Sequence, residues 1–166
     1  MQKTYKGFTL DTFQIEAIES LENNHSVIVS ASTGTGKTLI ADYVIDKAMH
    51  EGKKVFYTAP IKALSNQKFK DFISDYGEES VGIMTGDIVI NPQAPIVVMT
   101  TEIYRNMLMV NDPVVEEISY IVFDEIHFIN DIERGVVWEE SIIFSPEHVR
   151  FLALSATIPN ADEFAV

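Results

Sequence analysis

The stretch Ala31-Ser32-Thr33-Gly34-Thr35-Gly36-Lys37-Thr38 follows the apolar run Val27-Ile28-Val29 and precedes an apolar-periodic segment that begins at Leu39. This order predicts a strand, a loop of small residues and a helix that begins with Gly-Lys-Thr. Backbone N–H groups converge in such a loop, and the helix N-terminus adds partial positive charge. The pattern is therefore typical of a phosphate-binding loop.

Each polar or small residue of this loop has an expected role. Thr33, Gly34, Thr35, Gly36, Lys37 and Thr38 are the predicted nucleotide-binding residues. Glycine lets the backbone approach a phosphate without a Cβ in the way. The Lys37 amine can reach the outer phosphates, and the Thr38 hydroxyl can ligate Mg²⁺. The usual pattern opens with glycine, but position 31 is alanine. The alternative to a phosphate-binding loop is a plain strand–turn–helix. The context favours an ATPase or a GTPase.

Composition indicates one globular domain. The chain has 166 residues, 46% of them hydrophobic. The sequence contains no run of about 18 apolar residues, so no membrane span is predicted. The first residues are not followed by the apolar segment of a secretory signal. The absence of cysteine excludes disulfides and thiolate metal sites, and we expect a cytoplasmic or otherwise intracellular setting. The four histidines include no i, i+4 pair, which argues against zinc; they are His25, His50, His127 and His148.

The net charge of −13, with a pI near 4.5, counts against a nucleic-acid binder on composition alone. A local contact surface remains possible, because helix N-termini and backbone amides can hold phosphates without Lys or Arg.

Short β-branched runs alternate with helical patterns along the chain. The expected strands are 27–30, 54–58, 81–84, 96–99, 120–124 and 151–155, and the expected helices are 11–22, 36–51, 61–76, 101–110 and 136–143. Near-continuous apolar strands of this kind are buried on both faces. We therefore predict an α/β fold, a doubly wound, mostly parallel twisted sheet with helices on both faces, in which ligands bind at the carboxyl ends of the strands.

A second acidic element lies at such a strand end. The run Ile121-Val122-Phe123 leads directly into Asp124 and Glu125. A carboxylate pair at a buried strand end needs compensation, which a divalent cation supplies. Asp124 would hold Mg²⁺, and Glu125 would orient and deprotonate the attacking water. The alternative is a strand that ends in solvated acids.

Together these segments resemble the motifs of superfamily 2 helicases. Asp124-Glu125-Ile126-His127 resembles their DExH box, the segment 31–38 their motif I, and Ser155-Ala156-Thr157 their motif III. The segments 59–64, 100–102 and 85–87 resemble motifs Ia, Ib and Ic, and Phe8 with residues 10–14 resembles the adenine-reading segment. The resemblance implies a RecA-like P-loop NTPase fold.

Longer segments narrow the resemblance to one branch. Residues 65–68, 131–140 and 155–160 are similar to the superkiller-type RNA helicases, which assist the exosome in eukaryotes. This resemblance implies that residues 1–166 form the ATP-binding, first RecA-like domain, which we expect to be excised from a longer helicase. A second RecA-like domain of the same parent chain and single-stranded nucleic acid, most simply RNA, are the implied partners, with ATP and Mg²⁺ as cofactors and no membrane contact.

The resemblance also implies roles for further residues. Gln14 would read the adenine edge and Phe8 would pack against it, although an ordinary helix position and core packing are the alternatives. His127, Ser155 and Thr157 would couple the nucleotide site to nucleic acid. The implied nucleic-acid contacts are Pro60, Lys62, Asn66, Gln67, Thr85, Gly86, Asp87, Thr100, Thr101 and Glu102. For these the alternatives are a solvated lysine, a turn at 85–87 and a plain helix N-cap at 100–102.

The expected function is therefore nucleic-acid-stimulated ATP hydrolysis that drives strand translocation or unwinding, with Lys37, Asp124 and Glu125 as the catalytic residues. A nucleotide-gated RNA clamp or scaffold and a DNA translocase of the same superfamily stay open as alternatives.

Overall fold

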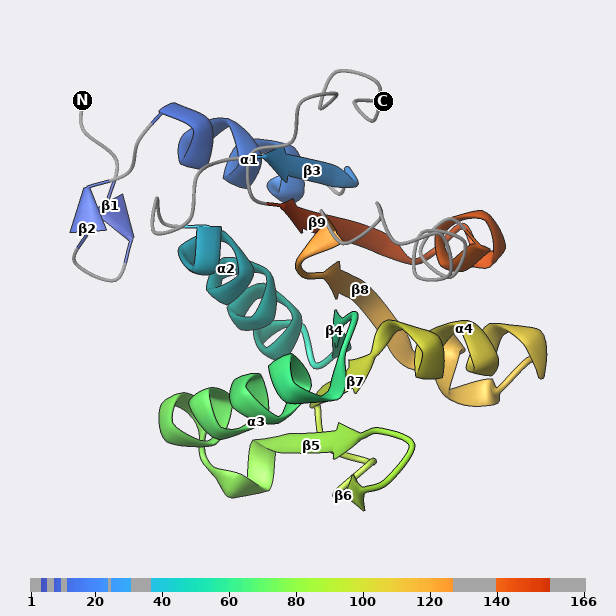
Figure 1. Ribbon diagram of the computed structural model, residues 1–166. Coiled ribbons are helices and arrows are strands. Elements are labelled where there is room, and N and C mark those ends of the chain that lie inside the picture. The colour runs from blue at the N-terminus through green and yellow to red at the C-terminus, as the bar shows by residue number, and fades with distance from the viewer. Residues whose placement is uncertain are drawn as a thin grey trace.

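A computed structural model describes residues 4–5, 8–9, 12–23, 25–30, 37–126 and 140–155 (Figure 1). Its main sheet has seven strands in the order β3-β9-β8-β4-β7-β5-β6. The strands are β3 (Val27–Ser30), β4 (Lys54–Ala59), β5 (Val81–Met84), β6 (Val89–Ile90), β7 (Ile96–Thr100), β8 (Ile118–Phe123) and β9 (Arg150–Ser155). All neighbouring pairs are parallel except β5 and β6, so the predicted, mostly parallel sheet is confirmed.

Helices cover both faces of this sheet (Figure 1). They are α1 (Thr12–Glu22), α2 (Lys37–His50), α3 (Lys62–Tyr76), α4 (Thr101–Met109) and the 3₁₀ helices η1 (Glu78–Ser80) and η2 (Pro113–Glu117). One apolar core joins α1, α2 and α3 to one face, and a second joins α4 and η2 to the other. Successive side chains of β4 point alternately into the two cores: Val55 and Tyr57 belong to the first core, and Phe56 belongs to the second.

The predicted elements agree with the structure to within one or two residues. Of the expected helix 136–143, the structure describes residues 140–144 as helical, and 136–139 lie outside the described residues. Several short elements were not predicted. They are a separate two-stranded antiparallel sheet of β1 (Thr4–Tyr5) and β2 (Phe8–Thr9), the edge strand β6, and the 3₁₀ helices η1 and η2.

The hairpin that forms β6 depends on one glycine. A Cβ added at Gly82 would lie 2.0 Å from the backbone oxygen of Asn91, so no other residue fits there without moving the chain. Asn91 itself has φ 47°, and its oxygen accepts from the Ala94 N–H at 3.1 Å, which forms a turn after β6.

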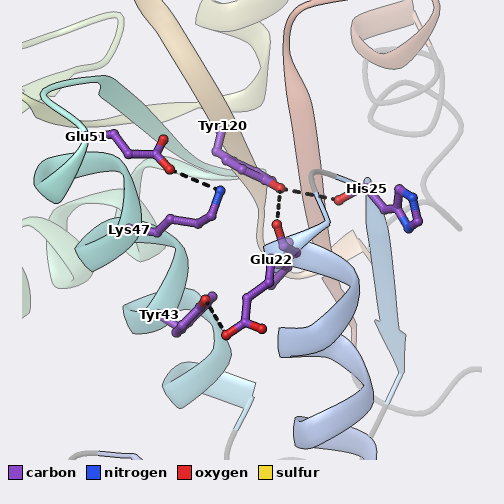
Figure 2. A network of polar contacts seen from close by, with 7 residues as sticks. Glu22, His25, Tyr43, Lys47, Glu51 and Tyr120 are labelled. Carbon is purple, nitrogen blue, oxygen red and sulfur yellow. Dashed lines mark hydrogen bonds and ion pairs between the residues drawn. The ribbon is translucent and has the colours of Figure 1, made fainter.

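A polar network fixes the end of α1 against α2 and β8 (Figure 2). The Tyr120 hydroxyl donates to the backbone oxygens of Leu21 at 3.1 Å and His25 at 3.4 Å. The Tyr43 hydroxyl donates to Glu22 at 3.0 Å. Burial raises the pKa of Tyr120 to about 12, so its hydroxyl stays a donor at neutral pH. The network holds α1, and with it Gln14, in one place on the sheet.

Candidate functional site

The parallel topology brings the candidate residues to one edge of the sheet. Ser30 and Ser155 end the neighbouring strands β3 and β9 and lie opposite each other. Asp124 follows β8, Pro60 follows β4, and Thr101 follows β7. The carboxyl ends of parallel strands meet at the same edge, which is where ligands bind in such sheets.

Asp124 is held by three hydrogen bonds at the end of β8. Its backbone N–H donates to the Thr58 oxygen at 2.8 Å. Its carboxylate accepts twice: Oδ2 from the Tyr57 hydroxyl at 2.5 Å, and Oδ1 from the backbone N–H of Glu125 at 2.8 Å. The carboxylate therefore has a defined orientation, as a metal ligand requires.

Tyr57 was not among the predicted site residues, because in the sequence it reads as one more apolar residue of a buried strand. Burial raises the pKa of the Tyr57 hydroxyl well above its usual value, and the nearby charges of Asp124 and Glu125 raise it further. The group therefore stays protonated and donates. No local pattern of the sequence marks it, because the contact depends on β4 and β8 being neighbours in the sheet.

Glu125 adopts an unusual backbone conformation, with φ 58°. A left-handed conformation at a residue with a side chain costs about 1–2 kcal/mol and occurs often at functional sites. The next residue, Ile126, is buried in the core that contains α4. The sharp turn thus separates a fixed Asp124 from an anchored Ile126 and leaves Glu125 half-buried at the edge.

Of the predicted phosphate-binding loop, the structure describes only the part that enters the helix. Lys37 is the first residue of α2, and the exposed Thr38 is the second. The predicted site residues Thr33, Gly34, Thr35, Gly36, His127 and Thr157 lie outside the described residues. Phe8 lies in β2, and Gln14 is buried on α1.

The oxygen ligands predicted for Mg²⁺ fit the chemistry of that ion. Within the described part of the chain, no group of three or more His, Cys, Asp or Glu side chains could enclose a metal. Mg²⁺ does not need such a group, because it is usually bound by one or two carboxylates together with phosphates and water. Asp124 and the Thr38 hydroxyl are donors of this kind.

The predicted nucleic-acid residues lie at the ends of β4, β5 and β7. Lys62 and Asp87 pair with each other at 2.7 Å, with both side chains largely exposed. The buried Thr85 accepts from the N–H groups of Asp87 and Ile88, each at 3.2 Å, so the predicted turn at 85–87 is present. Gly86, which lies in this turn, and Glu102 are exposed, Pro60 and Asn66 are half-buried, and Gln67 donates to Asp71 at 3.0 Å.

Two helices begin at this edge without a side-chain cap. The N-cap of α3 is Ile61 and that of α4 is Thr100, and neither makes a side-chain capping hydrogen bond. Thr100 therefore occupies the N-cap position of the plain alternative but makes no capping hydrogen bond with its side chain. Thr100 and Thr101 are both buried. Uncapped first-turn N–H groups are available to anions such as phosphate.

Comparison with known proteins gives a consistent set of relatives. The family model of the DEAD/DEAH box helicases matches residues 11–164. The chain is 54% identical to the DExH-box ATP-dependent RNA helicase DExH9 of Arabidopsis thaliana over 158 residues, which is 95% of this chain and 16% of that protein. It is 53% identical to the exosome RNA helicase MTR4 of Homo sapiens, over 95% of this chain and 15% of that protein. It is 51% identical to the antiviral helicase SKI2 of Saccharomyces cerevisiae, over 95% of this chain and 12% of that protein.

Solved structures agree on the fold. The DUF1998 helicase MrfA, solved with DNA and AMPPNP, aligns with a TM-score of 0.70 at 22% identity, covering 93% of this chain and 25% of that one. The chain spans about a sixth or less of the length of these sequence relatives. Among the residues described, no helix is both long and apolar enough to cross a membrane.

Proposed function

The chain belongs to the DEAD/DEAH box helicases, and we propose that residues 1–166 are the ATP-binding, first RecA-like domain of a longer ATP-dependent RNA helicase. The observation that carries this proposal is the oriented Asp124 carboxylate, with Glu125 beside it, at the same sheet edge at which α2 begins with Lys37 and Thr38. A bare strand end would not need its acidic side chain fixed on both oxygens.

The nucleotide would bind across this edge. Residues 33–36 and the first N–H groups of α2 would surround the phosphates, and Lys37 would reach the outermost one. Thr38 and Asp124 would hold Mg²⁺, which when bound neutralises charge on the phosphate oxygens. Glu125 would take the proton of the attacking water. Gln14, on the anchored helix α1, and Phe8 would contact the adenine.

Nucleic acid would lie along the neighbouring strand ends. The uncapped N-termini of α3 and α4 support this placement, together with Lys62, Asn66 and Gln67 on α3 and Thr101 and Glu102 on α4. Contacts of this type grip phosphates and are largely blind to sequence. His127, Ser155 and Thr157 would couple this surface to the nucleotide. RNA is favoured over DNA because two of these relatives, DExH9 at 54% identity and MTR4 at 53% identity, are named as RNA helicases.

The test is ATP hydrolysis and strand displacement by the parent protein that carries this sequence, measured on matched RNA and DNA duplexes with single-stranded overhangs. We expect that RNA stimulates ATP hydrolysis and that unwinding of the duplex requires ATP. Stimulated hydrolysis without displacement would indicate an RNA clamp, and a preference for DNA duplexes would indicate a DNA translocase. No ATP binding would contradict the proposal as a whole.

A further inference from the structure

We propose that Tyr57 is a positioning residue for Asp124, holding its carboxylate in the orientation in which it ligates the divalent cation of a bound nucleotide. The inference rests on the proposed function and deepens it, since it assigns a role to a residue outside the helicase motifs quoted above. It is carried by the hydrogen bond from the Tyr57 hydroxyl to Asp124 Oδ2 at 2.5 Å.

The ring of Tyr57 is itself fixed. The side chain is 1% exposed on the central strand β4. Its ring packs edge-on against Phe72 of α3, with 5.0 Å between the ring centroids and 77° between the planes. The Lys68 amine lies over the ring at 5.6 Å from its centroid. A ring held on these sides has one position for its hydroxyl, which is the property that a positioning residue needs.

The hydrogen bonds to Asp124 leave it able to bind a cation. Each carboxylate oxygen has two lone-pair directions. Oδ2 uses one for Tyr57, and Oδ1 uses one for the backbone N–H of Glu125. Rotation of the carboxylate about its last side-chain bond would break both contacts. The pair of donors therefore fixes the plane of the carboxylate and leaves one direction on each oxygen for a metal or a metal-bound water.

A purely structural role is a weaker explanation of this contact. A buried tyrosine hydroxyl needs an acceptor, but a neutral one is sufficient. Two other buried tyrosines use neutral acceptors: Tyr120 bonds to the backbone oxygen of Leu21, and Tyr104 bonds to Ser145. Tyr57 instead bonds to the charged side chain at the candidate metal site. Conserving the ring while removing the hydroxyl separates the two roles.

The test compares Tyr57→Phe with Tyr104→Phe. Both substitutions delete one hydroxyl from a fully buried ring, and the hydrogen bond of Tyr104 to Ser145 lies on the other face of the sheet. Calorimetry would measure binding of ADP to the parent protein that carries this sequence, with Mg²⁺ and with EDTA. Electron paramagnetic resonance would follow Mn²⁺ bound together with ADP. Thermal melts would confirm that each variant folds.

We expect Tyr57→Phe to weaken Mg²⁺-dependent ADP binding by about tenfold, in line with the effect of lost contacts to a metal ligand. Binding in EDTA should change by less than about twofold, because the phosphate loop is untouched. The resonance of bound Mn²⁺ should change in Tyr57→Phe and stay as in wild type in Tyr104→Phe. In an Asp124→Asn background, Tyr57→Phe should have no further effect on the metal-dependent part, since the charge that it positions is gone.

Equal Mg²⁺-dependent binding by wild type and Tyr57→Phe, or equal weakening by Tyr104→Phe, would overturn the positioning role and leave the proposed function intact. Equal weakening of binding with Mg²⁺ and with EDTA would also overturn it, since that pattern indicates general damage to the site. If wild type binds no ADP under either condition, the proposed function fails, and this inference fails with it.

Discussion

The residue with the greatest local strain in this site is Glu125. Its φ of 58° lies in the left-handed region. Among the described non-glycine residues, only Asn91 and Asn111 also have a positive φ. Asparagine tolerates that region because its short polar side chain bonds locally, and glutamate does not share this advantage. The flanking residues explain how the conformation persists: Asp124 is hydrogen-bonded on both sides, and Ile126 is buried in the core.

We predict that Glu125→Gly is more stable against unfolding than Glu125→Ala. Both changes remove the same carboxylate, so the difference between them reports the backbone alone. At a positive φ, glycine avoids the penalty that alanine incurs, and the expected difference is about 1 kcal/mol in the free energy of unfolding. Denaturant titration of both variants measures it. Equal stabilities would show that Glu125 does not hold this backbone conformation in solution.

We also predict that Glu125→Gln separates binding from chemistry. Glutamine keeps the size of the side chain and much of its hydrogen bonding but loses the base. ATP affinity should stay near that of wild type, while hydrolysis by the parent protein falls by about a hundredfold or more. Binding and steady-state turnover are measured on the same preparation. Turnover near wild type would remove Glu125 from the role of general base.

Lys37→Ala should weaken binding of the Mg²⁺–nucleotide by at least about tenfold, or about 1.4 kcal/mol, because the charge that meets the outer phosphates is lost. Lys47 of the same helix offers a control, since it pairs with Glu51 at 3.2 Å near the other end of α2. Calorimetry on Lys37→Ala and Lys47→Ala tests the prediction. Wild-type affinity in Lys37→Ala would refute the phosphate-loop assignment.

At the scale of whole elements, sequence reasoning succeeded where burial alone decides structure. Strands such as β4 and β7 are buried along their whole length and read as apolar runs, and the family resemblance given by the motif order is confirmed. It failed for β6, which has two exposed residues and depends on the approach of Asn91 to Gly82. It failed for Tyr57 for a similar reason: a contact between two strands depends on which strands are neighbours, and no local pattern encodes the order β8-β4-β7.

Helix α3 offers the sharpest test of the proposed nucleic-acid surface. We predict that Lys62→Ala weakens binding of single-stranded RNA by the parent protein to a similar extent for different sequences, and lowers the salt slope by about 0.7, the value for one lost phosphate contact on a single strand. Lys70, which is exposed on the same helix further from its N-terminus, is the matched control. Fluorescence anisotropy at several salt concentrations measures both variants.

Two other results would change the reading of this surface. Equal losses for Lys62→Ala and Lys70→Ala would indicate a general charge effect instead of a specific path. An unchanged affinity in Lys62→Ala would indicate that Lys62 serves only its pair with Asp87.

At the scale of the whole molecule, the charge distribution limits what this domain does alone. A net charge of −13 repels a polyanion, so the proposed affinity for nucleic acid would come from oriented amides, a few local cations and other parts of a longer parent protein. The sequence relatives are about six times or more the length of this chain, which leaves room for such parts.

The last prediction concerns the arginine that phosphoryl transfer needs. The sequence contains three arginines, Arg105, Arg134 and Arg150. Arg150 begins β9, at the opposite end of the strand from Ser155, and its side chain donates to the Glu147 oxygen. Arg105 lies within α4, 3.9 Å from Glu140. Neither lies in a segment proposed to contact the phosphates, and Arg134 lies outside the described residues.

Arginine fingers contribute about 10³–10⁵ in rate, and the proposed second RecA-like domain would supply one. Residues 1–166 alone should therefore bind adenine nucleotide weakly, hydrolyse it at least about a thousandfold more slowly than a chain that includes that domain, and unwind nothing. Steady-state ATPase of the two chains with saturating RNA measures the difference. If the short chain hydrolyses ATP as fast as the long one, then every group that the reaction needs lies on this one sheet edge, and the two-domain mechanism is wrong.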